Sequence, residues 1–175
     1  MQDTLIVVDM QKDFITGSLG SKDAEAIVEN VRDKVKAYYD AGKKIIFTKD
    51  THKNDYLSTF EGTRLPVEHC IFGTDGWHIT EDILKGIDCD ASNVMVVKKM
   101  GFGYKYYAEI FDGGSVEVCG LCTDICVVSN ALLIRSMFPS SEIIVDAKCC
   151  AGTTKDKHNA ALDVMESCLI DVINR

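Results

Sequence analysis

The chain has 175 residues, of which 46% are apolar and 26% are charged, and it contains only two prolines. This length and composition predict one globular domain, residues 1–175, with a substantial buried core. The formal net charge is −8, the pI is about 4.9, and no cluster of Lys and Arg interleaves with aromatic residues; this argues against nucleic-acid and membrane partners and favours a small-molecule ligand.

The first residues lead directly into a predicted strand, without a basic segment, an apolar signal segment or a cleavage site. The sequence therefore predicts a cytoplasmic protein. Most of the eight cysteines lie inside apolar segments, and no secretory context supports a bridged framework, so we expect reduced thiols.

The first half of the chain begins with a nearly unbroken apolar run over 4–8, which predicts a parallel strand covered on both faces and ending at Asp9. Apolar residues at helical spacing predict a helix over 24–39, and the next strand is predicted over 44–48. A long irregular segment then runs from residue 51 to about residue 78, rich in Gly, Thr, Asp and His. A loop of this length in a compact domain is usually functional.

Strands and helices continue to alternate in the second half. Strand patterns recur at 93–97, 115–119, 142–145 and 168–173, and helical patterns lie near 80–87, 105–112, 125–135 and 155–167. This alternation predicts an α/β fold with a doubly wound parallel sheet, helices on both faces, and a site outside the carboxyl ends of the strands.

Chemically useful side chains follow three of these strands. Asp9 follows the first, Lys98 and Lys99 follow the third, and Cys126 follows the fourth. At one edge of the sheet they would form a hydrolytic set, in which the carboxylate takes the thiol proton and an ammonium group stabilises the thiolate. Each also has an ordinary alternative: Asp9 as the cap of the following turn, and either lysine as a solvated strand end.

Cys126 lies in the first turn of a predicted helix, with Thr123 or Asp124 as the expected cap. The positive end of the helix and a cationic neighbour would lower the pKa of this thiol below its free value of roughly 8.5. The same turn offers backbone N–H groups for an oxyanion.

Two other interpretations of this cysteine-rich segment compete with the nucleophile. Cys126 by itself could be a small buried hydrophobic residue. The close spacing of Cys119, Cys122 and Cys126 could also indicate metal ligation, but Cys119 ends an apolar strand and should point into the core, which argues against it.

Three motifs, in order and over essentially the whole chain, resemble those of the isochorismatase-like cysteine hydrolases. They are the opening motif DMQKDF at Asp9–Phe14, the loop motif PVEHCIFGT at Pro66–Thr74 and the nucleophile motif GLCTDICV at Gly120–Val127. Within that family the sequence is most similar to the nicotinamidases, also called pyrazinamidases. The resemblance implies the same α/β fold and an amidase activity.

The resemblance also implies catalytic roles. Asp9 would be the general base or acid, Cys126 the nucleophile, and Lys99 the ammonium that completes the triad. Lys98 is the alternative, and Lys99 is preferred because the family has an aromatic residue three positions beyond its lysine, where Phe102 lies. The backbone amides of Cys122 and Cys126 would form the oxyanion hole, and the family has a cis peptide before the residue that matches Cys122.

The long loop supplies candidate metal ligands, namely Asp50, His52, Glu61 and His69. Such a mixture of ligands suits a divalent metal, with zinc first and iron or manganese behind it. The positions match the nicotinamidase metal site with one departure: many members have a further histidine shortly after the one that matches His52. Some use a glutamate instead, and Glu61 lies where that residue is expected.

Aromatic residues could form walls for a flat substrate ring. Phe14, Trp77 and Tyr104 are the candidates, although core packing accounts for each equally well. His78 and His158 have no motif around them and are interpreted as surface residues.

The expected function is hydrolysis of nicotinamide to nicotinate and ammonia through a thioester on Cys126, in nicotinamide salvage. One alternative is a related cysteine amidohydrolase that acts on another small amide or ureide. The other is a non-catalytic metal-binding member of the fold, against which the intact Asp9, Lys99 and Cys126 set argues. An isochorismatase proper would lack the nucleophilic cysteine. The sequence leaves the oligomeric state open, a homo-oligomer included.

Overall fold

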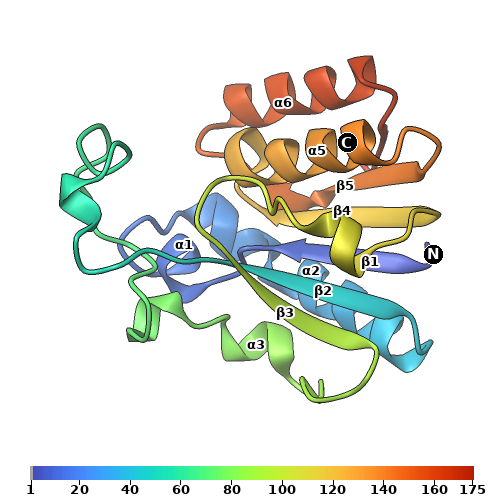
Figure 1. Ribbon diagram of the computed structural model, residues 1–175, viewed down its shortest axis with the longest axis horizontal. Helices are drawn as coiled ribbons and strands as arrows, with labels where there is room; N and C mark the ends of the chain where they lie inside the picture. Colours follow the sequence, from blue (N-terminus) through green and yellow to red (C-terminus); the bar gives the residue numbers. More distant parts are fainter. Residues whose placement is uncertain (1) are drawn as a thin grey trace.

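The computed structural model describes residues 2–175. Its centre is a parallel six-stranded sheet with strand order β3-β2-β1-β4-β5-β6 (Figure 1). The strands are β1 (Thr4–Val8), β2 (Lys44–Asp50), β3 (Val94–Lys99), β4 (Ser115–Leu121), β5 (Glu142–Ala151) and β6 (Asp171–Ile173). The predicted fold class is therefore confirmed.

Helices cover both faces of the sheet. They are α1 (Lys12–Ile15), α2 (Lys22–Asp40), α3 (Glu81–Leu84), α4 (Tyr107–Ile110), α5 (Val128–Met137) and α6 (Lys155–Ser167). Helix α2 packs against α3 on one face, and α5 packs against α6 on the other (Figure 1). Two 3₁₀ turns, η1 (Tyr56–Ser58) and η2 (Asp75–Trp77), interrupt the long loop, and one π-turn, η3 (Thr123–Val127), precedes α5.

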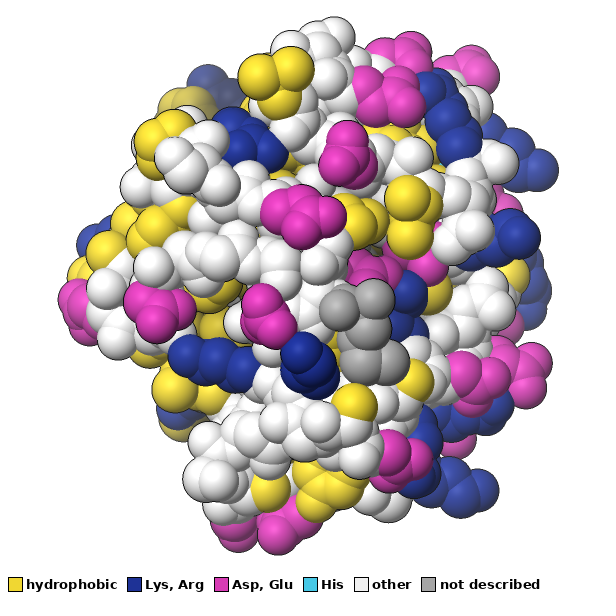
Figure 2. Space-filling model, turned by 90° about the vertical axis from the view of Figure 1, so that its right-hand side faces the viewer, with side chains coloured by type: hydrophobic (Ala, Val, Ile, Leu, Met, Phe, Trp, Pro, Cys, Tyr) yellow, Lys and Arg dark blue, Asp and Glu magenta, His cyan; other side chains and the backbone are white. Residues whose placement is uncertain are grey.

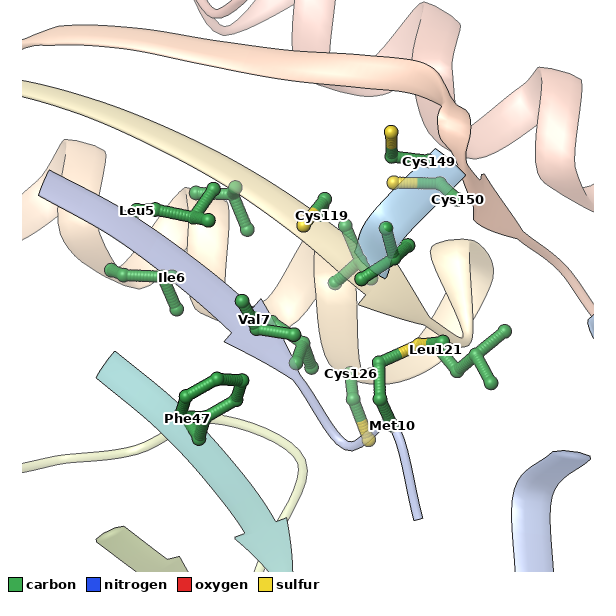
Figure 3. Close-up of a cluster of buried hydrophobic side chains, with 14 of the residues drawn as sticks. Leu5, Ile6, Val7, Met10, Phe47, Cys119, Leu121, Cys126, Cys149 and Cys150 are labelled. Atoms are coloured by element: carbon green, nitrogen blue, oxygen red, sulfur yellow. The ribbon is translucent and has the colours of Figure 1, made fainter. Parts of the chain in front are cut away.

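From β1 the chain adds β2 and β3 toward one edge of the sheet, and from β4 it adds β5 and β6 toward the other edge. β1 and β4 are neighbours at this reversal of strand order. All five residues of β1 are buried, and Val7 lies between Phe47 of β2 and Cys119 of β4. Figure 3 shows these side chains in the core, with Met10 directly after the carboxyl end of β1. Ligand sites in open α/β sheets form at such a reversal, outside the carboxyl ends of the strands.

Some strand boundaries differ from the sequence prediction. β2 and β3 extend through Asp50 and Lys99, which pair in register as the last residues of their strands. In a sequence, charged residues usually indicate the end of a strand. Here Asp50 and Lys99 continue the pairing of β2 with β3, because their side chains contact one another. β5 extends to Ala151, after a register shift against β4, and β6 begins only at Asp171.

Some helix boundaries also differ. The helices predicted near 80–87 and 105–112 form only the single turns α3 and α4, and α1 was not predicted. Gly86, with a φ of 79°, follows α3 and is incompatible with its continuation.

A buried polar cluster fixes α2 to the sheet. The Lys34 ammonium group pairs with Glu117 and lies 2.8 Å from an Asp146 carboxylate oxygen, and the Tyr38 hydroxyl donates to Glu117 at 2.6 Å. We call Lys34, Tyr38, Glu117 and Asp146 the Lys34 cluster. It satisfies charges that burial would otherwise make costly.

Figure 2 shows the face on the right-hand side of Figure 1. Acidic and basic side chains are mixed on it, and neither sign forms a continuous patch there. Within residues 2–175, no helix is both long enough and apolar enough to cross a membrane. All eight cysteines are free thiols, as expected.

Candidate active site

Asp9, Lys99 and Cys126 meet at the carboxyl edge of the sheet. The Lys99 Nζ atom lies 2.6 Å from Asp9 Oδ2 and 3.4 Å from Cys126 Sγ. All three side chains are buried, with relative exposures of 0%, 3% and 6% for Asp9, Lys99 and Cys126. The sequence prediction thus named three residues that the fold brings into contact.

The backbone around these residues explains how they come together. Asp9 has a φ of 49°, which turns the chain directly after β1, and its Oδ1 atom accepts a hydrogen bond of 2.6 Å from the Thr48 hydroxyl. On the neighbouring strand, Gly120 has a φ of 117°, and a Cβ atom there would lie 2.1 Å from the Val8 carbonyl oxygen. Glycine therefore allows β4 to approach β1 closely just before the nucleophile turn.

The two adjacent lysines point in opposite directions because side chains alternate along β3. Lys99 is buried against Asp9 and Cys126, whereas Lys98 is exposed, with its ammonium group 4.8 Å from the Phe72 ring centroid. The geometry therefore favours Lys99 over Lys98.

Burial dominates the electrostatics of this group. Burial raises the pKa of the Cys126 thiol, the Asp9 carboxylate raises it further, and Lys99 opposes both. The expectation of a lowered pKa at Cys126 is therefore wrong, because desolvation of the thiolate outweighs the cation. Burial also raises the pKa of Asp9 against the effect of Lys99, which makes this carboxylate a stronger base.

Lys99 itself stays charged. Burial alone would lower its pKa, but the negative charges of the Asp9 and Asp50 carboxylates outweigh burial and raise it. The site therefore combines a protonated thiol, a carboxylate of increased basicity and a fixed ammonium group.

The nucleophile turn is a π-turn rather than the first turn of an α-helix. The Val127 N–H donates to the Cys122 carbonyl at 3.0 Å, and the Leu121–Cys122 peptide is cis, as the family resemblance implied. Neither Thr123 nor Asp124 caps the helix. The Thr123 hydroxyl instead lies 2.8 Å from His158 Nδ1, and Asp124 accepts two hydrogen bonds from Thr153.

The sequence suggested that His158 is a surface residue, and this interpretation is wrong. His158 is half-buried against the nucleophile turn. His78 is exposed, as expected.

Asp50, His52 and His69 form a buried cluster next to the triad, with one potential ligand atom from each residue within 4.8 Å of the others. Asp50 Oδ2 lies 2.9 Å from His52 Nε2 and 3.6 Å from His69 Nε2. Glu61 Oε1 lies 3.9 Å and 3.7 Å from the same two nitrogen atoms, and its side chain is partly exposed. The four predicted ligands thus converge, with Glu61 at the outer side.

The donor set fits a divalent metal ion. His69 Nδ1 donates to the Val67 carbonyl oxygen at 2.8 Å, and this hydrogen bond orients the ring so that Nε2 faces Asp50. Burial would raise the pKa of Asp50, but hydrogen bonds with His52 and His69 and the charge of Lys99 outweigh it and lower the pKa. Asp50 is therefore an ionised carboxylate, as a metal ligand must be.

Two residues that support the cluster were not predicted. The Gln11 side chain accepts from the Asp50 N–H at 2.7 Å and donates to the Asp50 carbonyl at 2.9 Å, so it holds this backbone on both sides. Asp13 accepts from the Cys70 N–H at 2.7 Å, directly after His69. Both belong to the DMQKDF motif, whose polar residues are the signal that could have identified them.

A cavity of about 1130 Å³ opens above this arrangement. Its lining includes Cys126, the Asp50–His52–His69 cluster, Glu61 and Phe14. Trp77 and Tyr104 are absent from the lining, unlike the prediction. The Trp77 ring packs beneath the Lys49 ammonium group at 2.9 Å, and Tyr104 packs edge-on against Tyr107. Core packing, the alternative interpretation, describes both residues.

Together, the sheet order, the reversal between β1 and β4 and the site at that reversal define an isochorismatase-like α/β fold. The model of the Isochorismatase domain family matches residues 3–175, and the chain belongs to this family. No curated protein matches the sequence significantly.

Solved structures similar to this chain include nicotinamidases. The nicotinamidase/pyrazinamidase of Bacillus subtilis is 25% identical with a TM-score of 0.86, and the alignment covers 98% of this chain and 99% of that one. The pyrazinamidase/nicotinamidase of Streptococcus mutans is 25% identical with a TM-score of 0.84, over 97% and 99% of the two chains. The pyrazinamidase of Pyrococcus horikoshii in complex with zinc shares the fold at 24% identity, with a TM-score of 0.83 over 98% of both chains.

Proposed function

We propose that this protein is an amidohydrolase that cleaves nicotinamide to nicotinate and ammonia, in nicotinamide salvage. The observation that carries the proposal is the contact of the Lys99 ammonium group with both Asp9 and Cys126, next to the Asp50–His52–His69 cluster. The similarity to two solved nicotinamidases at 25% identity supports the choice of substrate.

In the proposed acylation step, Asp9 accepts the thiol proton and the Cys126 sulfur attacks the carboxamide carbon. The carbonyl oxygen becomes an oxyanion facing the backbone amides of Cys122 and Cys126. Asp9 then gives the proton to the leaving nitrogen, and the C–N bond breaks to release ammonia. Lys99 stabilises the thiolate until its sulfur bonds to the carbon.

In the proposed deacylation step, a water molecule attacks the thioester carbon while Asp9 accepts its proton. The C–S bond breaks, nicotinate leaves, and the proton returns to the Cys126 sulfur. Atoms balance over the cycle: one water is consumed, and one carboxylic acid and one ammonia are formed.

Asp50, His52, His69 and Glu61 would hold a divalent metal ion, and we propose zinc, with iron or manganese as substitutes. When bound, the metal supplies a Lewis acid for the pyridine nitrogen of the substrate and so orients the ring. The ring centroids of Phe14 and His69 are 5.5 Å apart. Phe14 lines the cavity, where it would pack against the pyridine ring of the substrate.

The size of the cavity favours a second candidate, a related cysteine amidohydrolase for a bulkier amide or a ureide. Pockets of roughly 300–1,000 Å³ hold drug-sized ligands, and this cavity of about 1130 Å³ exceeds the needs of one pyridine ring. Its mouth carries four exposed apolar side chains that could contact a larger substituent: Phe60, Leu65, Met100 and Phe102.

An ammonia-release assay separates these candidates. The metal-loaded protein is given nicotinamide, pyrazinamide, nicotinamides with an apolar ring substituent, and a small ureide. The highest kcat/KM on nicotinamide would support the first candidate, and a clear preference for a substituted amide or the ureide would support the second. Release from none of these, with metal bound, would contradict both and indicate a non-catalytic member.

A further inference from the structure

Asn130, on α5, uses every hydrogen-bonding position of its side chain. Its Nδ2 atom donates to the Cys126 carbonyl at 2.7 Å and to the Phe102 carbonyl at 3.1 Å. Its Oδ1 atom accepts from the Tyr104 N–H at 2.9 Å and from the Tyr107 hydroxyl at 2.8 Å. The residue is completely buried, so these protein groups take the place of water.

These four bonds join two segments that are remote in the sequence. One is the π-turn that carries Cys126. Asn130 lies four residues further along the chain, where η3 meets α5, and binds the Cys126 carbonyl. The other is the segment 102–107, which begins three residues after Lys99. Asn130 thus fixes the backbone of the cysteine relative to the chain that follows the lysine.

We propose that Asn130 is a positioning residue that sets the separation of the Lys99 ammonium group from the Cys126 sulfur. The inference rests on the roles proposed for these two residues. Asn130 touches neither the sulfur nor the ammonium group and acts through the backbone on both sides. Small errors in such a separation reduce reactivity strongly, because the contact is short.

An amide side chain is suited to this task. Two of its partners are carbonyl oxygens, which need N–H donors, and the other two are donors, which need an acceptor. A carboxylate offers no donor, and an aliphatic side chain of similar size offers neither. Burial raises the pKa of the Tyr107 phenol, so this partner remains a neutral donor.

The test measures the rate at which iodoacetamide alkylates Cys126 between pH 6 and pH 9, by peptide mass spectrometry on metal-loaded protein. Asn130→Leu removes all four bonds at similar volume, and Asn130→Asp keeps the acceptors but loses both amide donors. Ser136→Ala, on the exposed side of the same helix, is the matched control. Circular dichroism and metal content establish that each variant is folded.

We expect both Asn130 variants to slow Cys126 alkylation by roughly 10–100-fold at neutral pH. Asn130→Asp should recover part of the loss at lower pH, because its protonated carboxyl group can donate one hydrogen bond. On a hydrolysed amide, kcat should fall with little change in KM. Ser136→Ala should match the unmodified protein. Folded Asn130 variants with unchanged alkylation at every pH would overturn the proposal.

If both Asn130 variants fail to fold, Tyr107→Phe decides the question. It removes one of the four bonds and should slow alkylation by roughly two- to tenfold. An unchanged rate in that variant would overturn the proposal. Alkylation needs no substrate, so this test is independent of the proposed function. If the protein hydrolyses no amide but the reactivity of Cys126 still depends on Asn130, the proposed function is refuted and the role of Asn130 stands.

Discussion

Replacing Lys99 with methionine removes the ammonium group that lies 3.4 Å from the Cys126 sulfur, while keeping a side chain of similar length. The Lys99 charge lowers the pKa of this thiol against the opposing effect of burial, so its loss raises the pKa further. A smaller fraction of the thiol is then ionised at any given pH. We therefore expect slower alkylation of Cys126 and an alkylation profile displaced to higher pH.

The distance sets the scale of this effect. Two unit charges separated by 3.4 Å interact by about 5 kcal/mol at an effective dielectric constant of about 20. The net effect is smaller, because without Lys99 the Asp9 carboxylate binds a proton more readily and repels the thiolate less. If about half of the energy remains, alkylation at pH 7.5 should slow by roughly 100-fold.

The assay is iodoacetamide alkylation quantified for each cysteine, with circular dichroism to establish folding. Lys98→Met is the matched control, since Lys98 is exposed and points away from the thiol, and it should leave the profile unchanged. Cys89 is exposed, and its alkylation should be the same in all variants. An unchanged Cys126 profile in Lys99→Met with a shifted profile in Lys98→Met would transfer the role to Lys98. A shift in neither variant would remove lysine from the mechanism.

Three further predictions concern the metal, the pH dependence and stability. His69→Ala should abolish stoichiometric zinc binding, and Glu61→Ala should weaken zinc binding by roughly 10–100-fold. Elemental analysis and zinc titration measure both effects. Unchanged zinc affinity in Glu61→Ala would remove Glu61 from the ligand set. Thr48→Val removes a hydrogen bond that lowers the pKa of Asp9, so this pKa should rise and the acid limb of kcat should move to higher pH; an unmoved limb would mean that Asp9 is not the base. Lys34→Ala leaves the buried carboxylates of the Lys34 cluster unpaired and should lower the free energy of unfolding by about 3 kcal/mol in urea titrations, whereas a loss below about 1 kcal/mol would refute a stabilising role.

The fold could be predicted because strand and helix patterns alternate along the whole chain, and that alternation permits few topologies. Asp9 and Cys126 could be predicted for the same reason, since both follow strands that end at one edge of the sheet. The choice of Lys99 over Lys98 needed the family resemblance, and the structure explains it by the alternation of side chains along β3.

Other features depend on tertiary contacts that a single sequence does not display. The pKa of Cys126 could not be predicted, because its direction depends on how much burial outweighs the charge of Lys99. Trp77 resembles a ring-binding wall in the sequence, yet its partner is Lys49, on a strand almost thirty positions earlier. Asn130 carries no motif, and its importance becomes visible only when its four partners are seen together.

The proposed mechanism depends on attack by the Cys126 sulfur on the carboxamide carbon. Ammonia release from nicotinamide by Cys126→Ala and by Cys122→Ala, in proteins with equal zinc content, tests this step. We expect no release above background for Cys126→Ala. We expect near-normal release for Cys122→Ala, because only the backbone amide of Cys122 has a proposed role. Ammonia release by Cys126→Ala at the rate of the unmodified protein would show that Cys126 is not the nucleophile.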